Sequence, residues 1–169
     1  MSSSKRPAAN KAGGLEGLAR RFLTFGVRSR AELAAYLAGR GASPEETERL
    51  TREFTTRGLL DDRACAKLTA TRLADDGFAA RLIRARLLEK GLDAALIDAI
   101  LPGVAPPADD AVRARTLVLQ QLPQSGPSRR HARARLARLL ASRGHDADLS
   151  ESLLADILGP ASDSIHADE

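Results

Sequence analysis

The chain has 169 residues, of which 43% are apolar and only 3% aromatic, and its formal net charge is +4. This length suits one ordinary domain or a short array of repeats. The scarcity of aromatic residues favours helices over strands, so we predict an all-α fold. A single cysteine excludes an internal disulfide and a cysteine-based metal cage. Because the chain has no apolar run of about 18 residues and no signal-peptide core, we expect a cytoplasmic protein.

The charges are unevenly distributed along the chain. Residues 102–145 contain eight Lys or Arg and two acids, whereas residues 146–169 contain seven acids and no Lys or Arg. This pattern indicates an anionic partner for the basic part and an acidic tail that competes with that partner. The alternative is that the charges only keep the protein solvated.

The predicted elements are helices separated by glycines. Residues 1–14 are predicted to form a disordered basic tail, because Ser, Pro, Asn and Gly dominate there. After a helix over about 15–25, Ser29 and Glu32 match the capping box that starts a helix, and Gly41 ends that second helix. The remaining helices are predicted at about 44–57, 62–76, 79–90, 93–101, 110–122, 129–143 and 147–158.

Several boundaries follow from single residues. An aspartate of the pair Asp61 and Asp62 caps one helix, and Asp93 caps another. Pro102 is expected to close the helix that precedes it. Residues 102–109 are predicted to be a Pro-rich linker, and residues 159–169 an acidic disordered tail.

A repeat relates the three groups of helices. When Gly41, Gly91 and Gly144 are superimposed, apolar residues coincide eight and four positions before the glycine and nine positions after it. The coinciding residues are Leu33, Ile83 and Leu136, then Leu37, Leu87 and Leu140, and finally Leu50, Ile100 and Leu153. Since the glycines are 50 and 53 residues apart, we predict one three-helix unit used three times, over residues 15–58, 59–101 and 110–158.

The sequence contains no catalytic constellation. The histidines His131, His145 and His166 lie in different segments, and exposed histidines are the favoured interpretation over metal ligands. No phosphate-binding loop is present, so we expect a protein that is not an enzyme and has no cofactor or metal. Cys65 replaces an apolar position in a helix and is expected to be buried and inert.

Basic residues carry the clearest functional signal. Residues 129–143 contain six arginines and no acid, and these arginines lie at the edges of an apolar stripe or opposite it. Such a face attracts a polyanion or an acidic partner, with a solvated helix as the equal alternative. The candidates in this helix are Arg129, Arg130, Arg133, Arg135 and Arg138.

Other cations have simpler explanations. Arg81 and Arg84 flank the apolar Ile83, and a solvated helix face is the favoured interpretation for them. Cations directly before the repeat glycines complement a helix dipole; these are Arg40, Lys90 and Arg143. Aromatic platforms for stacking on single-stranded nucleic acid are not expected, because the few Phe and Tyr residues occupy apolar stripes.

Three segments, SRAELAAYLAGRG, LLDDRACAKLTATRLADDGF and IRARLLEKGLDAALIDAIL, resemble the RecX family of recombination regulators in their order and spacing. The resemblance covers about residues 15–158 and is strongest from Val27 to Leu101. It implies tandem three-helix repeats in an elongated, curved molecule. It also implies a regulator that is not an enzyme, binds in the groove of the RecA–single-stranded-DNA filament, and suppresses RecA's ATPase and strand exchange.

The resemblance also implies contact residues, carried over by position. These are Arg30, Arg81, Arg84 and Lys90, to which the arginines of residues 129–138 are added. The partners would be RecA and single-stranded DNA, and for some members duplex DNA, with the protein itself a monomer. Two alternatives remain: a stand-alone DNA-binding protein that uses residues 29–57 as a helix-turn-helix, and a structural scaffold.

Overall fold

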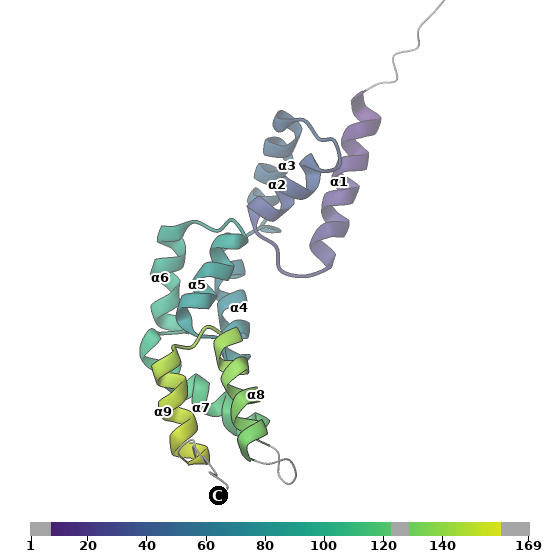
Figure 1. The fold of residues 1–169 in the computed structure, drawn as a ribbon. Helices are drawn as coiled ribbons and strands as arrows, with labels where there is room; N and C mark the ends of the chain where they lie inside the picture. The colour runs from purple at the N-terminus through teal and green to yellow at the C-terminus, as the bar shows by residue number, and fades with distance from the viewer. Residues whose placement is uncertain (1–7, 123–128, 160–169) are drawn as a thin grey trace, which may run out of the picture. The chain divides into compact units, whose positions relative to one another are not determined.

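In the computed structural model, which describes residues 8–122 and 129–159, the chain is built of α-helices with no strand (Figure 1). The predicted all-α fold is confirmed. None of the described helices is long and apolar enough to cross a bilayer. The helices are α1 (Ala8–Thr24), α2 (Arg30–Ala38), α3 (Pro44–Thr56), α4 (Asp62–Asp75), α5 (Ala80–Glu89), α6 (Ala94–Val104), the short 3-10 helix η1 (Pro107–Asp109), α7 (Asp110–Gln121), α8 (Arg129–Ser142) and α9 (Ala147–Leu158).

The repeat columns are core positions. All nine apolar residues that coincide in the alignment on the glycines are buried, with exposed fractions from 0% to 8%. The three glycines have φ values of +82°, +71° and +84°, which are accessible to glycine and strained for other residues. The periodicity therefore located both the packed face and the turn of each repeat.

Local hydrogen bonds start the helices where the sequence predicts. The Ser29 hydroxyl accepts from the Glu32 N–H while the Glu32 carboxylate accepts from the Ser29 N–H, and Ser43 and Glu46 form the same reciprocal pair at the start of α3. Asp61 accepts from the backbone N–H groups of residues 63 and 64 at 2.8 and 3.1 Å. These bonds satisfy donors that the first turn of a helix leaves unpaired.

Two boundaries differ from the prediction. Helix α1 begins at Ala8, because the alanines and lysine of residues 8–12 are good helix formers that extend it toward the N-terminus. Helix α6 continues through Pro102 to Val104. The Ala105 N–H still bonds the carbonyl of Leu101 at 2.8 Å, and both residues are buried, so packing offsets the bond that proline cannot donate. The Pro-rich linker is correspondingly shorter.

The chain divides into two compact units. The first comprises Met1–Ala70 and Ala85–Ile100, and the second Thr71–Arg84 and Leu101–Glu169, so the division crosses α4 and α5. The predicted boundaries of the three repeats therefore stay a prediction. One core cluster contains Leu15, Ala19, Leu33, Leu37, Leu50, Phe54 and Leu60, and another contains Ala114, Leu117, Val118, Leu136, Leu140, Leu153 and Leu154.

Candidate functional site

The first unit contains a joint between α2, α4 and the end of α5. The Ser29 hydroxyl donates to the Lys90 carbonyl at 2.5 Å, and Lys90 Nζ donates to both carboxylate oxygens of Glu32 at 2.8 Å. Burial acts to raise the pKa of Glu32, but its hydrogen bonds with Lys90 and with the Ser29 N–H outweigh burial, so its pKa is lowered. Lys90, predicted as a contact residue, thus holds a half-buried internal ion pair.

Arg30 takes part in the same joint. Its backbone N–H and its Nε donate to the two carboxylate oxygens of Asp62, each at 2.8 Å. The Arg30 side chain nevertheless remains 54% exposed. One edge of its guanidinium is therefore committed to Asp62, and the rest is accessible to a partner.

The second unit contains the equivalent joint, one repeat later. The Ala79 N–H donates to the Arg143 carbonyl at 2.9 Å, and the Ala80 N–H donates to Asp110 Oδ1 at 2.9 Å. Arg81 Nε donates to the Gly144 carbonyl at 2.6 Å. Ala80 corresponds to Arg30 in the alignment, and Asp110, like Asp62, is the first residue of the helix that opens the next repeat. The same joint is thus built twice.

Both joints require a glycine for space as well as for conformation. A Cβ built on Gly91 would lie 2.4 Å from Cβ of Ala31, and one built on Gly144 would lie 2.7 Å from Cβ of Leu82. A Cβ on Gly41, which has no preceding repeat, would meet nothing within 4 Å. The close approach is therefore a property of the joint and not of the helix end.

The predicted exposure of the histidines is wrong for His145. This side chain is 3% exposed, and its Nε2 lies 2.8 Å from the Gly77 carbonyl oxygen. Because a carbonyl oxygen only accepts, the proton of this hydrogen bond is on Nε2. Tertiary packing of the turn after α8 buries His145. Its contact with Gly77 spans 68 residues, so the spacing of residues in the sequence cannot reveal it. The His131 side chain and His166 lie outside the described residues.

The cations before the repeat glycines find specific partners. Arg143 lies over the Phe78 ring at 4.3 Å, and Arg40 lies over the Tyr36 ring at 4.9 Å. Cation–π contact of this kind is favourable by about 0.5–2 kcal/mol. It adds to the dipole complementarity that the sequence indicates.

The arginines of the third repeat are only partly free. Arg133 Nη1 donates to the Gly159 carbonyl at 2.8 Å, and Arg135 Nη2 donates to the Gln121 carbonyl at 2.6 Å. Arg138 is exposed and has no side-chain partner among the described residues. The side chains of Arg129 and Arg130 lie outside the described residues. In the middle repeat, Arg84 is half-buried and engaged within the protein.

Sequence reasoning missed several exposed groups. On α4, Arg63 and Lys67 are exposed one turn apart, and their side chains have no partner among the residues that the structure describes. Their spacing, opposite the buried Cys65 and Ala66, was the signal that could have found them. Phe25 is 70% exposed, so the prediction that the aromatic residues lie in apolar stripes is wrong there: α1 ends one residue earlier, and the chain turns away from the core.

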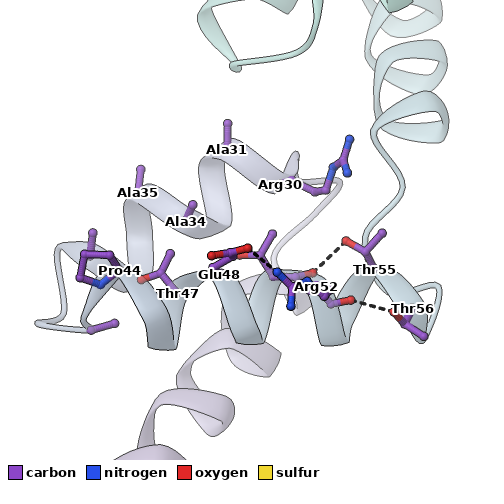
Figure 2. A pocket seen from close by; sticks show the side chains of 13 residues that line it. Arg30, Ala31, Ala34, Ala35, Pro44, Thr47, Glu48, Arg52, Thr55 and Thr56 are labelled. Atoms are coloured by element: carbon purple, nitrogen blue, oxygen red, sulfur yellow. Dashed lines mark hydrogen bonds and ion pairs between the residues drawn. The ribbon is translucent and has the colours of Figure 1, made fainter.

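A groove of about 880 Å³ lies between α2 and α3 in the first unit (Figure 2). Ala31, Ala34, Ala35 and Ala38 of α2 line one side of it, and Thr47, Thr51 and Thr55 of α3 line the other. Arg30, Arg52 and Glu48 are its charged residues, and Arg52 pairs with Glu48. The groove is therefore apolar with charges along its edges.

The described residues bear on two kinds of site, a metal site and a reactive thiol. There, no group of three or more His, Cys, Asp or Glu residues could hold a metal ion. Cys65 is fully buried, as predicted, and burial raises the pKa of its thiol. A thiol in this setting is largely protonated and unreactive at neutral pH.

Comparison with known proteins identifies the fold. No protein-family model and no curated protein sequence matches this chain. The crystal structure of RecX from Lactobacillus salivarius matches 88% of this chain and 97% of its own, with a TM-score of 0.65 and 16% identity. A crystal structure described as regulatory protein RecX matches 90% of this chain and 81% of its own, with a TM-score of 0.63 and 18% identity. The fold of this chain is therefore the helical-repeat fold of RecX, as the resemblance of its segments predicted.

Proposed function

We propose that this protein is a RecX-like regulator that binds the RecA–single-stranded-DNA filament and inhibits its ATPase and strand exchange. The observation that carries the proposal is the fold, which is shared with a RecX crystal structure over 88% of this chain. The order and spacing of the three sequence segments that resemble RecX, and the exposed cations, support the proposal.

The mechanism we propose is steric and electrostatic. Exposed cations without internal partners, Arg63, Lys67 and Arg138, would meet acidic RecA surface or phosphate, and Arg30 would contribute its accessible edge. Each joint fixes a helix start to the following repeat by several hydrogen bonds, so each unit would present a stiff surface. A stiff unit that bridges neighbouring RecA subunits resists the rearrangement that ATP turnover and strand exchange require.

The direct test is the steady-state ATPase of the cognate RecA on single-stranded DNA, titrated with this protein. Loss of turnover well below one protein per RecA supports a regulator that caps filament ends or promotes disassembly. Loss only near saturation supports coating of the groove. Unchanged turnover at every ratio would overturn the proposal.

A variant pair tests the electrostatic part. Arg63→Ala with Lys67→Ala removes two unpaired cations from α4, and we expect the inhibitory concentration to rise about tenfold as contacts with the anionic partner are lost. The matched control is Arg49→Ala with Arg57→Ala, which removes the same charge from residues that lie outside the groove between α2 and α3 and are already paired with Glu53 and Glu16. Equal loss in both variants would place the contact elsewhere.

The helix-turn-helix alternative is less well supported. A recognition helix contacts bases with residues near its N-terminus. The corresponding first turn of α3 carries Glu45 and Glu46. The two carboxylates would face the negative potential of the groove, so we expect no sequence-dependent duplex binding in the absence of RecA.

A further inference from the structure

The groove between α2 and α3 has a counterpart in the third repeat. A second groove, of about 600 Å³, lies between α8 and α9 in the second unit. Gly41 and Gly144 are 103 positions apart, and with that offset eight of the ten residues lining the second groove occupy positions that line the first. The agreement in position indicates one groove made twice.

The floors of the two grooves share two alanines. Ala34 and Ala38 of α2 correspond to Ala137 and Ala141 of α8, and all four residues line their grooves. Alanine side chains let the backbone of a packing element approach closely, to helix-axis distances near about 8 Å. Both grooves are therefore shaped for close backbone approach.

The charged edges agree at two positions. Arg30 and Glu48 of the first groove correspond to Arg133 and Glu151 of the second. Each groove thus has one cation and one anion at equivalent positions. Besides these, Arg52 lines the first groove, where it pairs with Glu48, and Arg81 and Asp146 line the second. An occupant that fits both grooves carries an acidic residue facing the arginine and a basic residue facing the glutamate.

The middle repeat has larger side chains at the same positions. Leu88 stands where the other repeats have Ala38 and Ala141, and Ile97 stands where they have Thr47 and Ser150. Leu88 is 39% exposed, so a leucine at this position is compatible with the repeat. The middle repeat therefore shows that a larger side chain is tolerated at this position.

The geometry favours a helix as the occupant. The alanines of α2 span residues 31 to 38, which is about 10 Å of helix or two turns. The backbone groups within α2 and α3 are bonded inside those helices, so they offer no ladder to an extended peptide. A helix satisfies its own backbone and needs only an apolar face.

We infer that the grooves of the first and third repeats each bind the same short amphipathic helix, presented by two different subunits of the partner. The inference rests on the proposed function, because a filament of identical subunits presents one surface helix many times. The helix has small apolar residues on its buried face, with an acid and a base on its flanks. Two moderate contacts of this kind on one protein give an avidity about 100-fold or more above either alone.

Filling the grooves tests the inference. Ala38→Leu and Ala141→Leu copy the middle repeat, and both alanines are exposed, so circular dichroism should show unchanged helix content. Binding to RecA–single-stranded-DNA filaments is then measured for each variant and for the double variant. The matched control is Ala64→Leu, an exposed alanine on α4 outside both grooves. We expect each single variant to bind about 100-fold more weakly, the double variant more weakly still, and the control unchanged.

A crosslinking experiment identifies the occupant. Ala38→Cys or Ala141→Cys, labelled with a benzophenone maleimide, should crosslink to the same RecA peptide from either groove, while the buried Cys65 stays unlabelled. Different peptides, or a double Leu variant that binds like the control, would overturn the inference and leave the proposed function standing. Wild-type protein that does not bind the filament would overturn both.

Discussion

Gly91→Ala would place a methyl group 2.4 Å from Cβ of Ala31, in the joint between the first and second repeats. Two costs add at this position. The residue has φ +71°, where a side chain costs about 1–2 kcal/mol, partly offset by about 0.4–1 kcal/mol from the stiffer unfolded chain. The overlap must also be relieved by movement of α2 or the turn, which in a packed region costs about 1–3 kcal/mol.

Gly41→Ala is the matched control, because its φ is +82° and no atom lies within 4 Å of the added Cβ. We therefore expect Gly41→Ala to lower the free energy of unfolding by about 1 kcal/mol, and Gly91→Ala by about 2–4 kcal/mol. At a urea m-value of about 2 kcal/mol/M, the midpoints should differ by about 0.5–1.5 M.

Urea unfolding followed by tyrosine fluorescence measures this difference in the unit that contains Gly91. Tyr36 is the only tyrosine, the chain has no Trp, and Tyr36 stacks on Phe22 in the first unit at 4.3 Å. Far-UV circular dichroism follows the whole chain in parallel. Equal midpoints for the two variants would refute the reasoning that the contact with Ala31 limits this position. A second check is Ala31→Gly, which removes the opposing Cβ and should recover about 1–2 kcal/mol in a double-mutant cycle.

Three further predictions concern Glu32, Asp110 and Cys65. Because the pKa of Glu32 is lowered in the folded state, the unfolded chain binds the proton first as pH falls; stability from this group is present above about pH 4.3 and lost below it. Glu32→Gln should therefore weaken the pH dependence of the urea midpoint between pH 3 and pH 5. A pH dependence equal to that of the wild type would argue against the ion pair with Lys90. Asp110→Ala removes the acceptor of the Ala80 N–H, so hydrogen exchange of that amide should become faster and the free energy of unfolding should fall by about 1–3 kcal/mol. Asp109, whose side chain makes no capping bond, is the control, and Asp109→Ala should leave the exchange rate unchanged. Equal exchange rates in the two variants would contradict the joint. Cys65 should react with a thiol reagent only in step with unfolding by urea, and rapid labelling of the native chain would disprove its burial.

The sequence by itself determined the local structure. Capping boxes at Ser29 and Ser43, and glycines in the left-handed region at the end of the second helix of each repeat, are set by groups within a few residues of one another. Their spacing is readable because a helix fixes the distance between positions three and four apart. The apolar columns are equally readable, because the face that must be buried recurs with the helical period.

Tertiary structure alone decided how the charged and polar residues are used. Lys90 reaches Glu32 across 58 residues, Ala80 donates to Asp110 across 30, and His145 contacts Gly77 across 68. Periodicity assigns such residues to a face but not to a partner, because the partner depends on how helices from different repeats pack. The same holds for the two grooves: the alanines and their flanking charges lie 103 positions apart in the sequence, and only the packing of the helix pairs shows that they line equivalent surfaces.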